Sequence, residues 1–486
     1  MSVHSSIRAT LDRIEQLDPQ VNAFTAVLRE RALRRASELD AAHAAGEASV
    51  GPLAGVPFAV KNLFDVAGLV TLAGSRIERE RPGAAPAAAD ATAVTRLEAA
   101  GAILVGALNM DEYAYGFTTE NTHYGPTCNP HDLQRMAGGS SGGSGAAVAA
   151  GFVPITLGTD TNGSIRVPAS LCGTFGLRPT FGRLSRGGSF PFVASLDTIG
   201  PLANSVRALA LAYDAMQGPD PRDPGCTQRA REPACPALRA DPEGNLAGLR
   251  VARLGGWFEA MATPEAVAVV DAAVAAIGAH VPVGRAEWPD AEIGRGAAFV
   301  ITAAEGGALH LDDLRHRYDA MEPHSRARFL AGALAPAAWV HRAHRVRRAH
   351  VERVDALFAD HDVLLAPAVP VVAPRIGEDW IEVRGKRLPS RPSMGVLTQP
   401  VSCAGLPVVA PRHGAFPEYL GTDLATARGL LHAPGDTRDL HAMLLLLADD
   451  PVLASRLGAS AHAFARAHHS PAAMAAGHEA IYDRLR

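Results

Sequence analysis

Strand-like and helix-like stretches alternate along the first 410 or so residues, and this alternation constrains the fold more than any other feature of the chain. Residues 102–108, 249–254 and 363–366 are apolar runs with the length of buried strands. Strands that alternate with helices are typical of sheets whose faces are covered. The pattern therefore predicts an α/β fold, in which helices cover both faces of one large, mixed central sheet.

Three helix-like stretches have an apolar face. Asp90 stands where a helix N-cap is expected, and Gly101 stands where that helix would end. Thr263 and Pro264 open a second helix, and a third lies at the N-terminus. The apolar residues that share a face are Ala93, Leu97 and Ala100 in the first helix, Val267, Val270, Val274 and Ile277 in the second, and Ile7, Leu11, Ile14 and Leu17 in the third.

Composition excludes several classes of function. The chain has 486 residues, and its formal net charge of −4 argues against nucleic acid or an anionic membrane as a non-specific partner. No apolar run has the length of a membrane span, and the N-terminus lacks a signal-peptide pattern. The five cysteines show neither a metal-ligand spacing nor a paired framework. We therefore expect a cytoplasmic protein with no nucleic-acid or membrane partner, no metal and no cofactor.

Two glycine-serine clusters and one lysine point to a chemistry. The clusters span residues 138–144 and 158–166, and Lys61 ends the apolar run 56–60. Serine is a weak nucleophile at its ordinary pKa, so a serine hydrolase needs a base and hydrogen-bond donors for the oxyanion. A lysine can be that base where burial keeps it neutral. Glycine lets the backbone approach a substrate and direct N–H groups at it.

Each of these features also has a plainer explanation. A lone lysine at a strand end is normally a surface residue, and a glycine-serine run is often a flexible linker. The first cluster is flanked by Arg135 and Met136 and by the helix-like residues 146–150, which are not typical of a linker. The two serine clusters in turn favour a catalytic interpretation of Lys61.

These residues resemble the motif of the amidase signature family, which hydrolyses amide bonds with a Ser-Ser-Lys triad. The resemblance runs from the N-terminus to about Pro407. It identifies Lys61 with the catalytic lysine, Ser140 with the bridging serine and Ser164 with the nucleophile, and it implies a cis peptide bond before Ser140. In that mechanism neutral Lys61 takes a proton from Ser164 through Ser140, and the relay then returns the proton to the leaving nitrogen.

The loop around the nucleophile completes this expectation. Asp160 and Arg166 flank it, and we expect them to form a structural ion pair or loop hydrogen bonds. Ser141 and Ser144 are expected to support the first cluster by hydrogen bonding. The candidates for the oxyanion hole are the backbone N–H groups of Thr161, Asn162, Gly163 and Ser164.

Two resemblances within the family imply different substrates. Residues 109–116 and 119–121 resemble the amidase subunit of glutamyl-tRNA amidotransferase, which would make the chain a glutamine amidase. In those relatives an aspartate binds the α-ammonium of the substrate, and this chain has Gly395 at the corresponding position. A glutamine ammonium would then be unpaired in a buried site, which is unfavourable. We therefore expect a substrate without an amino group.

A closer resemblance is to the amidase subunit of carboxybiuret hydrolase, from s-triazine ring degradation. It is carried by residues 117–124, 160–164, 288–294 and 302–315. It implies a small carboxylated urea derivative as the substrate and cleavage of a C–N amide bond through an acyl-enzyme. It leaves two protein partners open, a second copy of the chain and a small helical accessory subunit.

Four residues are candidates for binding this substrate. A carboxylate favours a bidentate cation, and Arg315 is the candidate by analogy to the carboxylate-binding arginine of the tRNA-linked relatives. A solvated helix charge explains Arg315 as well. Tyr115 and His123 are candidate pocket residues, or else packed core residues. Asn162 stands where most of the family has glycine, and it either contacts the substrate or occupies a left-handed turn.

The C-terminal segment departs from the family. Three helix-like stretches follow one another there and end the alternation. Residues 405–410, 417–418, 429–431, 434–436 and 447–451 resemble the C-terminal end of a GT-B glycosyltransferase. We therefore expect a chimera joined near residues 404–411. It would consist of an amidase signature domain at residues 1–407 and a helical, glycosyltransferase-like segment at residues 408–486.

This segment adds two alternatives. The amidase body would be folded but inactive if the segment replaced core elements that activity requires, and activity on any simple amide would decide this. A glycosyltransferase would require a nucleotide-sugar site built from two Rossmann-like domains, and residues 1–404 do not supply one.

Overall fold

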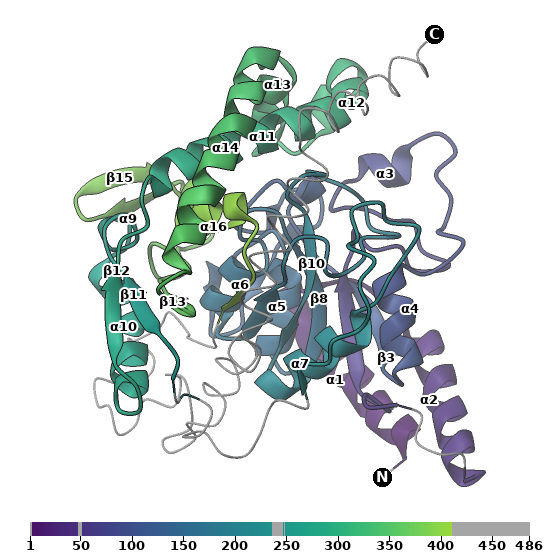
Figure 1. Cartoon of the computed structure of the whole chain (residues 1–486). Helices are drawn as coiled ribbons and strands as arrows, with labels where there is room; N and C mark the ends of the chain where they lie inside the picture. Colours follow the sequence, from purple (N-terminus) through teal and green to yellow (C-terminus); the bar gives the residue numbers. More distant parts are fainter. Residues whose placement is uncertain (1, 47–50, 236–245, 247, 411–486) are drawn as a thin grey trace.

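A seven-stranded mixed sheet forms the centre of the molecule (Figure 1). The computed structural model describes residues 2–46, 51–235, 246 and 248–410. β3, β2 and β8 are parallel to one another, and every other neighbouring pair in the sheet is antiparallel. The predicted mixed sheet is therefore confirmed. In spatial order its strands are β1 (Phe24–Val27), β3 (Ile103–Leu108), β2 (Pro57–Lys61), β8 (Ile155–Asp160), β10 (Thr198–Ala203), β9 (Phe175–Arg178) and β16 (Val408–Ala410).

Helices cover both faces of this sheet, as predicted. Successive side chains of a strand point to opposite faces. In β2, Phe58 and Val60 belong to one apolar cluster and Ala59 belongs to another. The first cluster includes side chains of α4 (Thr92–Ala99), α7 (Val206–Met216) and α11 (Ala291–Leu309), and the second includes side chains of α1 (Val3–Val21), α2 (Arg29–Ala44) and α5 (Gly142–Ala149).

Two of the predicted strands belong to a second sheet, which the sequence pattern did not reveal. β11 (Val251–Leu254) and β13 (Val363–Leu365) lie where strands were expected. β11 is the central strand of a three-stranded parallel sheet and pairs with β13 on one side and with β12 (Val283–Ala286) on the other. Parallel neighbours require a crossover connection, and α10 (Pro264–Gly278) supplies it between β11 and β12. The prediction of strands was right, and the prediction of one common sheet was wrong.

A group of helices joins the two sheets and forms one end of the molecule (Figure 1). α11 lies at its centre and contacts α13 (Arg326–Ala333), α14 (Ala337–Leu357) and α16 (Thr398–Ala404). α12 (Leu311–His316) follows α11 in the chain and leads toward α13. The remaining elements are short: α3 (Ile77–Glu80), η1 (Glu112–Ala114), β4 (Glu120–Asn121), β5 (Gly125–Pro126), β6 (Cys128–Asn129), β7 (Asp132–Met136), α6 (Arg166–Cys172), α9 (Trp257–Ala260), η3 (Tyr318–Ala320), β14 (Trp380–Val383), β15 (Lys386–Pro389) and α15 (Ser390–Ser393).

Asp90 does not cap the helix that follows it. α4 begins after Ala91, which makes no side-chain capping bond. The Asp90 carboxylate instead accepts two hydrogen bonds from Arg31, at 2.9 and 2.7 Å, and one from the N–H of Ala67 at 2.8 Å. A bidentate pair with a guanidinium is stronger than a bond to a neutral backbone donor, which explains the difference.

The expected C-terminal segment begins inside the sheet. β16 pairs with β9 in antiparallel register, and Ala410 is buried beside Ile165, Ala169 and Leu202. Residues 408–410 are therefore part of the same sheet as the rest of the chain. Residues 411–486, which carry most of the glycosyltransferase-like prediction, lie outside the described residues.

The crossing of α11 and α13 depends on glycine. A Cβ on Gly332 would lie 1.7 Å from the carbonyl oxygen of Ala303, and one on Gly307 would lie 2.3 Å from the backbone nitrogen of Ala333. Both contacts involve backbone, which cannot easily move aside. The two helices can approach this closely only because these two positions have no side chain.

We predict opposite effects of alanine at two glycines of these helices. Gly332→Ala should lower the free energy of unfolding by about 1–3 kcal/mol, because the helices are forced apart. Gly296→Ala should raise it by up to about 1 kcal/mol, because Gly296 is exposed on α11 with no atom near the added Cβ. Urea denaturation measures both changes, and equal effects of the two substitutions would contradict the predicted crossing.

Candidate active site

Lys61 is the last residue of β2 and is fully buried. Its Nζ donates hydrogen bonds to Oγ of Ser140 at 2.7 Å and to Oγ1 of Thr159 at 3.0 Å. Burial lowers the pKa of Lys61 from 10.5 to about 7, although the carboxylates of Asp111, Asp197 and Asp160 favour the charged form. A substantial fraction of Lys61 is therefore neutral near pH 7.

The first glycine-serine cluster holds Ser140 against this lysine. The peptide bond between Gly139 and Ser140 is cis, as the family resemblance implied. Oγ of Ser141 donates to the carbonyl of Thr159 at 3.2 Å, and Oγ of Ser144 donates to the carbonyl of Leu157 at 3.0 Å. These bonds tie the cluster to β8, which confirms the supporting role predicted for the two serines.

Ser164 lies in the turn between β8 and α6, and the buried carboxylate of Asp160 organises that turn. The carboxylate accepts backbone bonds from Gly163 at 2.7 Å and from Ile165 at 3.2 Å. It also pairs with Arg166 at 2.9 Å and with Arg178 at 3.3 Å. Burial raises the pKa of Asp160, but the two arginines outweigh it and bring the pKa down to about 2. The structural ion pair predicted for Asp160 and Arg166 is confirmed.

One of the four oxyanion candidates is already engaged. The N–H of Gly163 donates to Asp160, so it is not free to receive an oxyanion. The N–H groups of Thr161, Asn162 and Ser164 remain as candidates. The two clusters meet at this point, because the N–H of Ser141 donates to the carbonyl of Ser164 at 3.2 Å.

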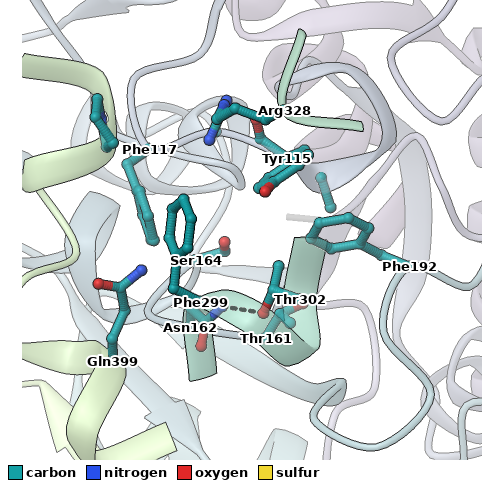
Figure 2. A pocket seen from close by; sticks show the side chains of 13 residues that line it. Tyr115, Phe117, Thr161, Asn162, Ser164, Phe192, Phe299, Thr302, Arg328 and Gln399 are labelled. Atoms are coloured by element: carbon teal, nitrogen blue, oxygen red, sulfur yellow. Dashed lines mark hydrogen bonds between the residues drawn. The ribbon is translucent and has the colours of Figure 1, made fainter. Parts of the chain in front are cut away.

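A small pocket opens in front of Ser164 (Figure 2). Its empty space, open solvent included, is about 380 Å³. Its walls come from segments that are far apart in the sequence, and none of the described residues that line it carries a carboxylate. They are Ala114, Tyr115, Gly116, Phe117, Thr161, Asn162, Ser164, Phe192, Phe299, Thr302, Arg328, Pro392 and Gln399.

A different arginine from the expected Arg315 lines the pocket. Arg315 is an exposed residue of α12 and does not line the pocket. Arg328 of α13 lines it, and both of its hydrogen bonds, to the carbonyls of Tyr115 at 2.6 Å and of His324 at 3.3 Å, use Nη2. Its Nη1 and Nε have no acceptor within the described part of the chain. The structure does not bring Arg315 to this pocket, because this residue of α12 faces the surface.

Tyr115 lines the pocket and His123 does not. The ring of Tyr115 is held by Phe329 and Phe192, at 4.7 and 5.0 Å between ring centroids, and Arg328 lies 4.0 Å above it. Its buried hydroxyl has no hydrogen-bond partner among the described residues and points toward Ser164 in Figure 2. Nε2 of His123 instead lies 3.0 Å from Oε1 of the buried Glu112. His123 therefore packs outside the pocket, which was the other alternative for this residue.

Asn162 reaches the pocket from the turn between β8 and α6, which also carries Ser164. Its Nδ2 donates to Oγ1 of Thr302 at 2.7 Å, and its Oδ1 has no partner among the described residues. Its backbone is not in the left-handed region, which contradicts the turn alternative. Tyr113 and Ala114, just before Tyr115, have positive φ angles of 49° and 61° instead. Such strain is typical of segments that position functional side chains.

Sequence reasoning missed a contact that shapes the pocket at Gly395. A Cβ on Gly395 would lie 2.3 Å from the ring of Phe117. The phenyl ring therefore fills the space that an aspartate side chain would need. Any side chain at this position displaces Phe117, so an aspartate substitution would change the shape of the pocket together with its charge.

Several other properties of the described residues bear on the expectations. No group of histidine, cysteine, aspartate and glutamate in this part of the chain could hold a metal ion. All five cysteines are free thiols. Among the helices of the same residues, none is both long and apolar enough to cross a membrane.

Comparison with known proteins agrees with this geometry. The model of the Amidase family matches residues 5–418. AtzE, the 1-carboxybiuret hydrolase subunit of Pseudomonas sp. (strain ADP), is 62% identical over 400 residues, which are 82% of this chain and 85% of that protein. A glutamyl-tRNA(Gln) amidotransferase subunit of Symbiobacterium thermophilum is 37% identical over 429 residues, covering 83% of this chain and 85% of the relative.

A solved structure is similar over nearly the whole chain. It belongs to an unexpected vestigial protein complex that reveals the evolutionary origins of an s-triazine catabolic enzyme. The TM-score is 0.83 and the sequence identity is 55%, over 93% of this chain and 96% of that one. From the family match and these relatives, the chain belongs to the amidase signature family of hydrolases.

Proposed function

We propose that the chain is an amidohydrolase that cleaves a C–N bond of a small carboxylated urea derivative such as 1-carboxybiuret. The observation that carries this proposal is the 2.7 Å contact between the buried Nζ of Lys61 and Oγ of Ser140, behind a pocket that Ser164 lines. A lysine with a lowered pKa can accept a proton, and in this proposal Ser140 passes the proton of Ser164 to Lys61.

The proposed reaction proceeds in two halves. Ser164 Oγ attacks the substrate carbonyl while its proton passes to Ser140 and the proton of Ser140 passes to neutral Lys61. Backbone N–H groups of Thr161, Asn162 and Ser164 stabilise the oxyanion. The relay returns the proton to the leaving nitrogen, the C–N bond breaks, and an acyl-enzyme remains. Water then attacks the acyl group, and the same relay accepts its proton and restores Ser164.

The charge of the pocket supports the substrate class. Among the described residues that line it, Arg328 is the one ionisable cation, and no carboxylate accompanies it. Its Nη1 and Nε make no hydrogen bond within the described residues, and a carboxylate oxygen can accept a single charge-assisted bond from either of them. The identity of 62% with the 1-carboxybiuret hydrolase subunit supports the same class of substrate.

Glutamine hydrolysis is the second candidate, because a glutamyl-tRNA(Gln) amidotransferase subunit is 37% identical. The α-ammonium of glutamine would find no carboxylate among the described residues of this pocket, and Phe117 occupies the space beside Gly395. A buried unpaired ammonium is strongly unfavourable. A protein without any activity is the third candidate, and ammonia release from a simple amide would exclude it.

We also propose that the chain works with a second subunit in the cytoplasm. The relative from Pseudomonas is named as a subunit, and the similar solved structure belongs to a protein complex. Leu334, which follows α13, and Trp339 of α14 are 74% and 62% exposed, and exposed large apolar residues are typical of surfaces that bind another protein when they gather in a patch. Activity assays therefore need the chain alone and with a small helical partner, and a homodimer is the alternative assembly.

The triad is tested by substitution. Ser164→Ala, Ser140→Ala and Lys61→Ala should each lower kcat for amide hydrolysis by at least about 10³-fold and leave the folded state intact by circular dichroism. Because the three groups act as one unit, a double substitution should be little worse than either single one. Near-normal turnover of Ser164→Ala would refute the mechanism.

The pH dependence of activity tests the state of the lysine. Lys61 must be neutral to accept a proton, and its pKa is lowered to about 7. We expect kcat/KM to rise up to tenfold per pH unit below pH 7 and to level off above it. Thr159→Val removes an acceptor that favours the charged lysine, so the acid limb should move to lower pH. An acid limb near pH 10, the range of an ordinary lysine, would contradict the lowered pKa of Lys61.

The carboxylate site is tested by comparing two arginines. Arg328→Gln should raise KM for 1-carboxybiuret by roughly 10- to 100-fold, the usual loss for a hydrogen bond to a charged group. KM for biuret, which has no carboxylate, should change much less. Arg315→Gln is the matched control and should change neither value, because Arg315 is exposed outside the pocket. A similar rise of KM for both substrates would show that Arg328 supports the structure and does not recognise the carboxylate.

A further inference from the structure

Gln399 is a buried polar residue on the wall of the pocket that the proposed mechanism does not use. It lies in the first turn of α16, and only 4% of its surface is exposed. Its Oε1 accepts a hydrogen bond from Nε of Arg295 on α11 at 3.0 Å. Its Nε2 has no acceptor within the described part of the chain.

The neighbouring arginine fixes which way the amide faces. The two ends of a glutamine amide are hard to distinguish by shape, and the hydrogen-bond network decides between them. A guanidinium only donates hydrogen bonds, so Arg295 must face the oxygen of Gln399. The NH₂ group is therefore turned the other way. In Figure 2 the nitrogen lies on the side of the pocket toward Ser164, and the oxygen points away from it.

Gln399 is also held at a fixed place relative to the nucleophile. Oγ1 of the preceding Thr398 donates to the carbonyl of Asn162 at 2.6 Å. Arg166, in the helix that follows Ser164, donates to the carbonyl of Thr398 at 3.2 Å. The first turn of α16 is thus joined directly to the nucleophile turn. A donor held in this way keeps its direction without loss of conformational freedom on binding.

We propose that Gln399, oriented by Arg295, is a specificity residue that donates a hydrogen bond to a carbonyl oxygen of the ureide substrate. The inference rests on the proposed function, because a carboxylated biuret carries carbonyl oxygens beyond the one that Ser164 attacks. A simple amide has no such oxygen and leaves the NH₂ group unused. Gln399 binds substrate directly in this proposal, and Arg295 is a positioning residue that acts through it.

The test compares two substrates across four variants of Gln399 and Arg295 and one control variant. Ammonia release gives kcat/KM for 1-carboxybiuret and for acetamide, and the ratio of the two values is the readout. Gln399→Leu should lower this ratio by roughly 5- to 100-fold, because the substrate carbonyl loses its donor in a buried site. Gln399→Glu should lower it further, because a carboxylate repels both the carbonyl oxygen and an anionic substrate.

The positioning role has its own signature. Arg295→Met should lower the ratio in part, since the amide is free to rotate, and Arg295→Lys should restore it, since lysine also donates to Oε1. Gly296→Ala, the next residue of α11, is the control for disturbance of the helix and should leave the ratio as in the wild type. Equal losses in Arg295→Met and Arg295→Lys would contradict the positioning role.

The two proposals fail in different ways. If wild-type protein prefers 1-carboxybiuret and Gln399→Leu keeps that preference, the inference about Gln399 is overturned and the proposed function stands. If wild-type protein shows no preference for 1-carboxybiuret over acetamide, the proposed substrate is refuted and the inference falls with it. A ratio that drops in Gln399→Leu on folded protein supports both.

Discussion

The buried carboxylate of Asp160 is the interaction on which the site depends. It accepts hydrogen bonds from the backbone of the nucleophile turn and pairs with Arg166 and Arg178. Arg166 in turn binds the carbonyl of Thr398 and the hydroxyl of Ser402 on α16. One carboxylate therefore connects β8, the turn that carries Ser164 and the helix that carries Gln399. Removing one partner of such a buried pair leaves an uncompensated charge, which typically costs about 3–5 kcal/mol.

Asp160 and Lys61 are both buried, but they differ in whether a group of opposite charge lies at hydrogen-bond distance. Asp160 is over-compensated by two arginines, so its charge is stable and structural. Lys61 has hydroxyl partners instead of a carboxylate at hydrogen-bond distance, and burial lowers its pKa. The carboxylates of Asp111 and Asp197 are themselves destabilised by burial, which raises the pKa of each. The pKa of Asp160 is thus lowered by its partners, whereas burial shifts the pKa values of Lys61, Asp111 and Asp197 toward their neutral forms.

The shape of the pocket is decided by contacts that exclude side chains. Phe117 lies against Gly395, and a Cβ there would collide with its ring. A Cβ on Gly163 would lie 2.2 Å from Oγ1 of Thr398. Small residues at these points let aromatic and polar side chains from distant segments meet in front of Ser164. Within the described residues, the result is a lining with hydrogen-bond donors, one guanidinium and no carboxylate, which fits a planar substrate with several carbonyl oxygens and a negative charge.

The sequence alone determined the mixed sheet, the covered faces and the motif residues, because strand and helix periods are local and the two glycine-serine clusters are long. It also placed Lys61 at a strand end and Asp160 and Arg166 on either side of Ser164. The tertiary structure decided the rest. Arg328 lines the pocket and Arg315 does not, the N–H of Gly163 is engaged by Asp160, and Gln399 lines the same pocket as Ser164. The pocket joins residues more than a hundred positions apart, and it depends on how closely α11, α13 and α16 pack. No local period encodes that packing, so a sequence read segment by segment cannot give it.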